Sequence, residues 1–175
     1  VIPRDTARQQ CLSNRITLSP LPATTHKRSD YFGNKAFHFE IQKPHTELVI
    51  TAVSEVQMSN KDHELNLDLG ISYKEALEYL RTTNRPDVME AREFVLSSPM
   101  IEPSDALTEY ARPSFAGNRS LKSCVADLTS RIFKEFKYDP QFSTIATPLA
   151  EVLQHKKGVC QDFAHVMLAC LRSLG

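Results

Sequence analysis

The spacing of apolar residues changes once along this chain, and this change constrains its fold more than any other feature. Up to about residue 61, apolar and polar residues alternate, as with Phe37, Phe39 and Ile41, which is typical of half-buried antiparallel strands. After Gly70 the spacing becomes helical. Strands followed by helices predict an α+β chain. The predicted strands cover residues 14–18, 36–42 and 47–58, the last of them with both faces partly covered.

Turn and capping residues divide these elements. Residues 26–30 are polar and predict a loop, and Gly33-Asn34 predicts a chain reversal. Asp30 and His45 are therefore expected to have only turn and loop roles. Capping boxes at Ser72 and Asp87 predict two helices, the second continuing to residue 96. Further helix starts are predicted near Ser104, at Ser120 and at Thr147-Pro148, where proline takes the first helical position.

The helix after Ser120 is the longest amphipathic pattern. Its predicted apolar face consists of Leu121, Cys124, Val125, Leu128, Ile132, Phe133 and Phe136.

The composition excludes several classes of partner. Lysine plus arginine number 21 and aspartate plus glutamate number 21, so the formal charge is zero. We therefore expect no nucleic-acid partner, and the apolar runs are too short to cross a bilayer. Its 175 residues suffice for one large domain or two small ones, and the oligomeric state stays open.

The cysteine pattern favours a reducing compartment. The four cysteines form no Cys-x-x-Cys pair and no disulfide framework, so a cytoplasmic location is expected. The start at Val1 says little about export. Cys124 and Cys170 fall on apolar helix faces and are predicted to be inert core residues.

Residues 158–175 are the part of the chain most informative about chemistry. Gly158 and Gly175 are predicted helix stops, and apolar residues cover more than half of the helix between them, which predicts burial on most sides. Cys160 is predicted in the first turn, near the centre of the buried arc. The opposite side is predicted to carry Gln161, Asp162, His165, Arg172 and Ser173.

Two interpretations of Cys160 remain open at this point. The unpaired amides and the dipole of a helix start favour a thiolate nucleophile, whereas the Asp162 carboxylate opposes ionisation. Alternatively, Cys160 is a small buried apolar residue, as most free cysteines are.

His165 is a poor partner for Cys160, because it lies about 140° around the helix from it. We expect His165 to face solvent or to support its neighbours. The same divergence argues against a metal site built from His155, Cys160 and His165. No metal and no cofactor are expected.

The segment Gly158-Val159-Cys160-Gln161-Asp162-Phe163-Ala164-His165, followed by an apolar helix, resembles the nucleophile segment of the bacterial transglutaminase-like superfamily. Residues 136–139 and 147–153 resemble the family's approach to this cysteine. Matches to its N-terminal β-domain are Pro3-Arg4, Gln10, Pro20-x-Pro22, Asp30-x-Phe32-Gly33-Asn34, Pro44-His45 and the strand 48–56. The resemblance implies a β-sandwich-like domain over residues 1–64 whose first strands precede Val1, a helical connector over 65–119, and the first part of a papain-like core over 120–175.

By this resemblance Cys160 is the nucleophile of a Cys-His-Asp arrangement. The family's histidine and aspartate lie on strands after the cysteine helix, so the triad is expected to be incomplete and this chain alone inactive. The resemblance implies acyl transfer on a peptide or protein amide, with protease, amidase or deamidase activity favoured over cross-linking. Gln161 is a candidate oxyanion donor, although the Cys160 backbone amide is the stronger one. The alternative is a non-enzymatic peptide- or protein-binding module built on a degenerate papain-like core.

Overall fold

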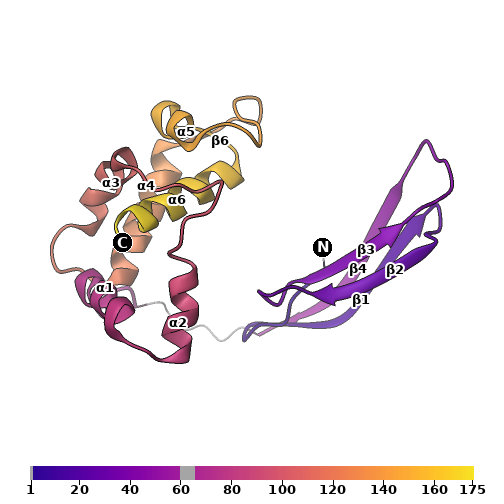
Figure 1. The fold of residues 1–175 in the computed structure, drawn as a ribbon, viewed down its shortest axis with the longest axis horizontal. Helices are drawn as coiled ribbons and strands as arrows, with labels where there is room; N and C mark the ends of the chain where they lie inside the picture. Colours follow the sequence, from indigo (N-terminus) through magenta and orange to yellow (C-terminus); the bar gives the residue numbers. More distant parts are fainter. Residues whose placement is uncertain (1, 60–65) are drawn as a thin grey trace. The chain divides into compact units, whose positions relative to one another are not determined.

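Antiparallel strands fill the first part of the chain and helices fill most of the rest (Figure 1), in a computed structural model that describes residues 2–59 and 66–175. The chain divides into two compact units, Val1–Glu64 and Leu65–Gly175. The α+β class predicted from the change of spacing is confirmed.

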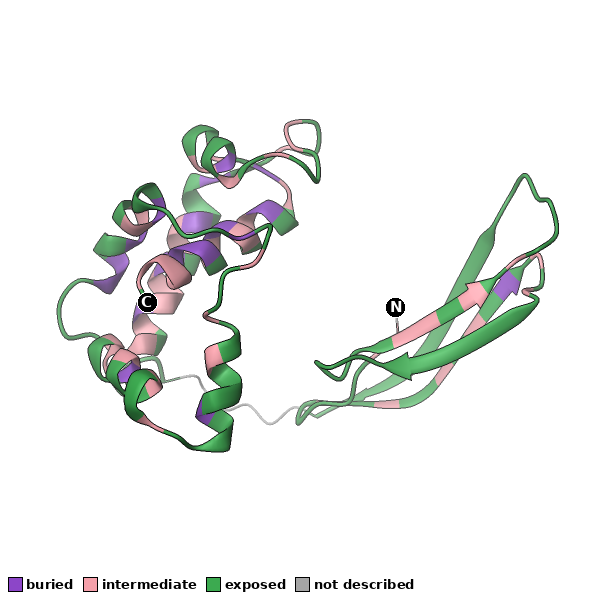
Figure 2. Cartoon of the chain, in the orientation of Figure 1, coloured by how far each residue is buried: buried purple, intermediate pink, exposed green. Residues whose placement is uncertain are grey.

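Two antiparallel strand pairs make up the described part of the first unit. β1 (Gln9–Ser19) pairs with β4 (Val49–Met58), and β2 (Thr24–Ser29) forms a hairpin with β3 (Lys35–Glu40). All ten β4 residues are exposed (Figure 2), so the prediction that its two faces are partly covered is wrong. Pairing with β1 satisfies the backbone groups along one edge of β4 and covers neither face. The packing of the two pairs into a sandwich stays a prediction.

The hairpin between β2 and β3 corrects one prediction and confirms another. Thr24–Ser29 is a strand where the sequence predicts a polar loop. Its six residues are all exposed, so it lacks the alternation that marks a half-buried strand. The predicted reversal is present: the Asp30 carboxylate accepts bonds from the backbone and side-chain amides of Asn34 at 2.8 and 2.9 Å, and Gly33 has a φ of 75°. The exposed His45 lies in a loop, and its Nδ1 is 2.9 Å from the Lys43 carbonyl oxygen.

Serine side chains start three helices at the predicted positions. In α1 (Tyr73–Thr82), the Glu75 amide donates to Ser72 Oγ at 3.3 Å and the Ser72 amide donates to the Glu75 carboxylate at 2.8 Å. Ser104 caps α3 (Asp105–Ala111), which leads into the 3-10 helix η1 (Arg112–Phe115). Ser120 caps α4 (Leu121–Glu135). Each cap satisfies an amide that has no acceptor within the helix.

Two other helices begin beside a proline, and the predicted capping roles of Asp87 and Thr147 are wrong. α2 (Pro86–Glu93) has Pro86 in its first turn, which needs no amide donor. Asp87 pairs with Arg85 at 2.9 Å instead of capping, and the helix ends before residue 96. α5 (Leu149–His155) begins after Pro148, because the Thr147 hydroxyl accepts the Thr144 amide in the preceding turn at 2.8 Å.

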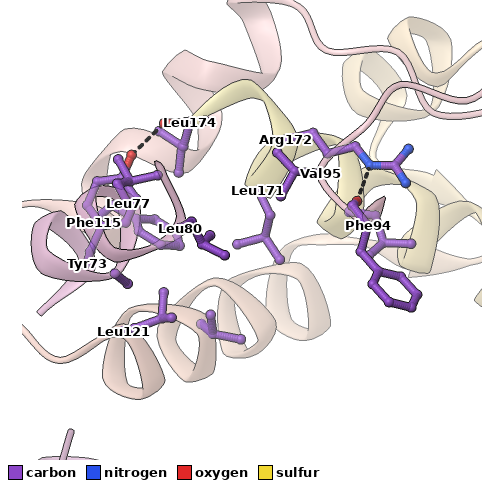
Figure 3. Close-up of a pocket in the computed structure, with 14 residues that line it drawn as sticks. Tyr73, Leu77, Leu80, Phe94, Val95, Phe115, Leu121, Leu171, Arg172 and Leu174 are labelled. Carbon is purple, nitrogen blue, oxygen red and sulfur yellow. Dashed lines mark hydrogen bonds between the residues drawn. The ribbon is translucent and has the colours of Figure 1, made fainter. Parts of the chain in front are cut away.

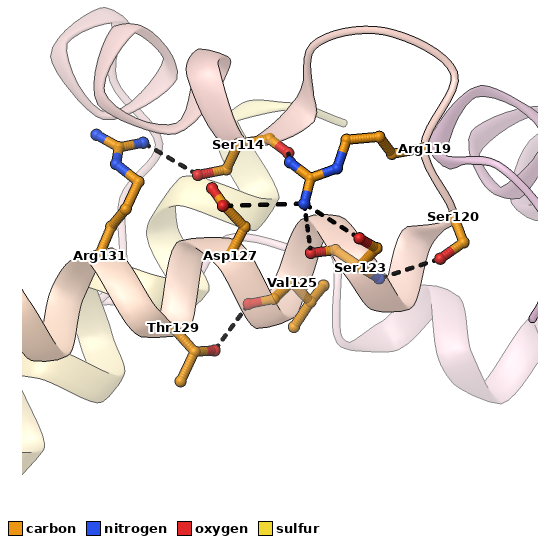
Figure 4. Close-up of polar contacts among 8 residues, drawn as sticks. All are labelled: Ser114, Arg119, Ser120, Ser123, Val125, Asp127, Thr129 and Arg131. Atoms are coloured by element: carbon orange, nitrogen blue, oxygen red, sulfur yellow. Dashed lines mark hydrogen bonds and ion pairs between the residues drawn. The ribbon is translucent and has the colours of Figure 1, made fainter. Parts of the chain in front are cut away.

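α4 has a polar side held to η1 by arginines (Figure 4). Arg131 donates to Ser114 Oγ at 3.0 Å, and Arg119 donates to the Ser114 carbonyl oxygen at 3.3 Å and pairs with Asp127 at 3.8 Å. On its apolar side, the buried positions repeat every four residues. These positions are Cys124, Leu128 and Ile132.

Phe133 is 85% exposed, so its predicted place on the apolar face of α4 is wrong. It directly follows Ile132 and is therefore rotated about 100° away from the buried stripe.

The hydrophobic core cluster of the described residues lies in the second unit, where α3, α4 and α5 pack against α6 (Cys160–Ser173). Its buried members are Ile101, Leu107, Ala111, Phe115, Cys124, Leu128, Ile132, Phe136, Val152, Val166, Ala169 and Cys170. Tyr110, Phe136 and Phe163 add edge-to-face ring contacts at 5.9 and 5.7 Å. No helix in the two described ranges combines the length and the apolarity that crossing a membrane requires.

A two-residue parallel ladder interrupts the helices just before Cys160. β5 (Lys137–Tyr138) pairs with β6 (Lys157–Gly158). Elements this short carry no periodicity, so the sequence gives no sign of them. The ladder brings the end of α4 beside the segment that leads into α6.

An apolar pocket of about 260 Å³ lies at the other end of α6 (Figure 3). Its walls are mostly apolar side chains of α1, α4 and α6, together with Phe94, Val95 and Phe115. The two polar groups at its edge hold the wall together: the Tyr73 hydroxyl donates to the Leu174 carbonyl oxygen at 2.7 Å, and Arg172 donates to the Phe94 carbonyl oxygen at 2.9 Å. Cys160 does not line this pocket.

Candidate active site

Cys160 is the first residue of α6 and is exposed. Its predicted place at the centre of the buried arc is wrong. Apolar residues cover so much of this helix that the sequence cannot decide which part of the arc faces the core. Ala164 and Leu168 are also exposed, so Cys160 heads an exposed apolar stripe, one residue per turn. The buried residues of α6 are Asp162, Val166, Ala169 and Cys170.

Asp162 holds the segment that leads into Cys160. Only 8% of it is exposed, so its predicted place on the polar side is wrong. One carboxylate oxygen, Oδ2, accepts the Val159 amide at 2.7 Å and the Ser143 hydroxyl at 2.5 Å. Val159 is the N-cap residue and makes no side-chain capping bond. The carboxylate three residues later therefore caps this helix start.

Gly158 passes directly against the Asp162 carboxylate. Its φ is 154°, and a Cβ atom there would lie 2.5 Å from Asp162 Oδ2. The predicted helix stop at Gly158 is wrong, because α5 ends at His155 and Lys156 adopts the left-handed conformation with a φ of 50°. Glycine is needed at 158 for close approach and for its backbone conformation.

The loop of residues 139–147 packs against this turn. The Asp139 amide donates to the Gly158 carbonyl oxygen at 2.8 Å, and the Phe142 ring lies 5.5 Å from the His155 ring. Lys156 donates to the Glu135 carboxylate at 2.6 Å. This bond is the main cause of a lowered pKa for Glu135. The path into Cys160 is thus held from α4, from the loop and from α6.

Neither Gln161 nor His165 is hydrogen-bonded to the Cys160 thiol. Gln161 is exposed and His165 is half-buried, and both line a pocket of about 120 Å³ with the side chains of Ser143, Thr144 and Thr147. Across the described residues, no side chain is hydrogen-bonded to Cys160 Sγ. His155 is engaged with Phe142.

The other thiols occupy different settings. Cys124 and Cys170 are 1% and 0% exposed, which confirms their predicted burial. Burial raises the pKa of both, that of Cys170 to about 12. Cys11 is half-buried on β1. In the part of the chain that the structure describes, no group of three or more histidine, cysteine or acidic side chains could hold a metal ion.

Neither the role of Ser143 nor the burial of Asp162 is predicted from the sequence. A signal for Asp162 exists, because a carboxylate three residues after an N-cap is the capping-box position. Ser143 has no such signal, since it lies 19 residues earlier in an irregular loop.

The fold of this chain is similar to that of a solved structure. The structure superposes with a TM-score of 0.65 on the crystal structure of a putative cysteine protease from Cytophaga hutchinsonii, over 98% of this chain and 55% of that one. The two sequences are 20% identical, so this likeness concerns the fold.

Two regions of the sequence match family models. Residues 1–57 match the bacterial transglutaminase-like N-terminal region, and residues 108–175 match the transglutaminase-like superfamily. These matches confirm the resemblance to the bacterial transglutaminase-like superfamily that the cysteine segment carries.

Curated relatives align with almost the full length of this chain and are longer than it. An uncharacterized protein of Mycobacterium tuberculosis is 39% identical over 173 residues, which are 99% of this chain and 54% of that protein. An uncharacterized protein of Mycobacterium leprae is 28% identical over 174 residues, 99% of this chain and 58% of that protein. The chain spans about half the length of the curated relatives it matches.

Proposed function

We propose that Cys160 is the nucleophile of a transglutaminase-like cysteine enzyme that acts on amide bonds by acyl transfer. One observation carries this proposal: Cys160 is exposed at the start of α6, whereas Cys124 and Cys170 are buried in the core. A nucleophilic thiol must reach its substrate and favours the electropositive end of a helix.

The reaction proceeds in two steps. The Cys160 thiolate attacks the amide carbonyl carbon, the C–N bond breaks, and the amine leaves with a proton from the general acid. The acyl group is then a thioester on Cys160 Sγ. Water or a second amine attacks this thioester and releases the thiol. The substrate is a peptide or protein amide, and hydrolysis by water is favoured over cross-linking.

The backbone amide of Cys160 is the main oxyanion donor in this proposal. It belongs to the first turn of α6, where amides lack an acceptor within the helix. The exposed side-chain amide of Gln161 is the second candidate.

The general base is proposed to lie outside residues 1–175. Among the described residues none is hydrogen-bonded to Cys160 Sγ, and the family resemblance implies a histidine and an aspartate on strands after the cysteine helix. The additional length of the relatives is compatible with this placement.

The test is amide turnover by the intact protein on a glutamine-containing peptide, with and without an added primary amine. Release of ammonia or a cleaved peptide, abolished by Cys160→Ala, supports the enzyme. Incorporation of the amine at the expense of hydrolysis would instead identify cross-linking. Peptide binding without turnover in the wild type would identify a binding module and overturn the proposed reaction.

A further inference from the structure

We propose that Asp162, held by Ser143, is the residue that positions Cys160 for reaction. This inference rests on the proposed function and concerns the turn from which the nucleophile projects. Asp162 does not touch the reacting atoms in this scheme. It acts through the backbone of residues 158–160.

The bonds of the carboxylate define what it fixes. Asp162 Oδ2 accepts the Val159 amide at 2.7 Å, so the residue before the nucleophile is fastened to the first turn of α6. The same oxygen accepts the Ser143 hydroxyl at 2.5 Å, which fastens the carboxylate to the loop 139–147. With one oxygen bonded on both sides, rotation of the Asp162 side chain breaks a bond in either direction.

Close packing against Gly158 is a third restraint on the Asp162 side chain, beside its two hydrogen bonds. A Cβ atom at this position would lie 2.5 Å from Asp162 Oδ2 and 2.9 Å from Asp162 Cβ. The backbone just before Val159 lies so close to Asp162 that position 158 has no room for a side chain. The Gly158 backbone and the Asp162 side chain are therefore packed so closely that neither can move without displacing the other.

Ser143 is itself held in place, so it is a firm anchor. Residues 139, 142 and 144 of its loop each make a hydrogen bond or a ring contact. The Asp139 amide bonds to the Gly158 carbonyl oxygen at 2.8 Å, the Phe142 ring contacts His155, and the Thr144 amide bonds to Thr147 Oγ1 at 2.8 Å. A serine in a loose loop could not fix a carboxylate.

The anchor at Asp162 affects the position of the Cys160 thiol and of the Cys160 amide. Cys160 directly follows Val159, so the bond at Val159 restrains the backbone from which the thiol side chain and the proposed oxyanion donor, the Cys160 amide, project. Misplacing a reacting group by about 1 Å can cost about 100-fold in rate. Loss of this anchor should therefore lower kcat more than it changes KM.

The experiment uses three variants of the intact protein: Ser143→Ala, Ser143→Thr and Asp162→Asn. Amide turnover gives kcat and KM, and amide hydrogen exchange reports the Val159 N–H directly. Ser143→Ala should lower kcat about tenfold with little change in KM and speed Val159 exchange about fivefold. Ser143→Thr keeps the hydroxyl and should restore most of the rate. Asp162→Asn keeps one acceptor for Val159 but loses the charge, so its kcat should also fall.

Glu75→Gln is the matched control. Glu75 occupies the same position in the α1 capping box, where its carboxylate accepts the Ser72 amide at 2.8 Å. α1 meets the far end of α6 through the Tyr73 bond to Leu174. This variant should lose some stability but keep kcat, KM and Val159 exchange.

The outcomes separate the two proposals. Unchanged Val159 exchange in Ser143→Ala, or faster exchange with unchanged kcat, would overturn the positioning role. Equal losses of kcat in Ser143→Ala, Ser143→Thr and Glu75→Gln would assign the effect to general stability and also overturn it. A wild type without turnover would overturn the proposed function, and Val159 exchange would then decide by itself whether Asp162 and Ser143 fix the Cys160 turn.

Discussion

The four cysteines of this chain occupy environments that decide their reactivity. Cys160 is exposed at a helix start, Cys11 is half-buried on a strand, and Cys124 and Cys170 are enclosed by the core. Burial raises the pKa of the two core thiols, which keeps them protonated and inaccessible near neutral pH.

Limited alkylation of the folded, intact protein with iodoacetamide should therefore label Cys160 well before Cys124 and Cys170. Peptide mapping over time gives the three rates. Unfolding in guanidinium is the control and should make all three thiols reactive. Labelling of Cys124 or Cys170 ahead of Cys160 in the folded protein would contradict the assignment.

The pKa of Cys170 also predicts a change of stability with pH. Burial raises this pKa from 9.0 to about 12, so between these values the native state keeps a proton that the unfolded state loses. The stabilising contribution is complete below about pH 9 and is lost as the pH rises through about 12, at up to about 1.4 kcal/mol per pH unit. Urea unfolding at a series of alkaline pH values measures this slope.

Cys170→Ala should flatten that slope, although the variant is less stable overall. Burial also raises the pKa of Tyr110 to about 12 and raises the pKa of both Cys124 and Tyr73. Adding Tyr110→Phe should therefore flatten the slope further without removing it. A slope that is the same in the wild type and the double variant would refute the linkage.

At the level of elements, the sequence predicts a helix start well where a single capping side chain determines it. Ser72, Ser104 and Ser120 cap their helices because each hydroxyl meets an amide that has no other acceptor. The prediction fails where two signals compete, as at Thr147, whose hydroxyl serves the preceding turn. It also fails for β2, where every residue is exposed and no periodicity exists.

The corrected face of α4 gives a paired stability test. Leu128 is 0% exposed, whereas Phe133 on the same helix is 85% exposed. Leu128→Ala should cost about 2–5 kcal/mol of unfolding free energy, because it leaves a cavity in the core. Phe133→Ala should change it by less than about 0.5 kcal/mol. Chemical denaturation of both variants measures the difference, and similar losses would place Phe133 in the core after all.

At the level of the whole molecule, the sequence predicts the class of fold but only part of the site. The change of spacing near residue 70 predicts strands first and helices second, because periodicity reports which residues share a face. The residues around Cys160 make it the candidate nucleophile, as the family resemblance implies. The site around it depends on Ser143, on the β5 and β6 ladder and on the orientation of α6, which arise from contacts between segments distant in sequence.

The proposed placement of the general base predicts that residues 1–175 alone have no amide turnover. A cysteine nucleophile needs a base at about 2.6–3.2 Å, and no described residue is bonded to Cys160 Sγ. Assay of this chain beside the intact protein, on the same glutamine-containing peptide, measures the difference. Comparable turnover from both, abolished by Cys160→Ala, would mean that His155 or His165 serves as the base.

The ladder and loop before α6 have a consequence for the order of folding. The bonds from Ser143 to Asp162 and from Lys156 to Glu135 span 19 and 21 residues, so the Cys160 turn closes through short chain loops. Contacts of low sequence separation form early, since little loop entropy is lost. We therefore expect the nucleophile turn to acquire its shape before α1 docks on the end of α6, a contact 101 residues apart. Pulse-labelling hydrogen exchange during refolding should protect the Val159 amide ahead of the amides of α1.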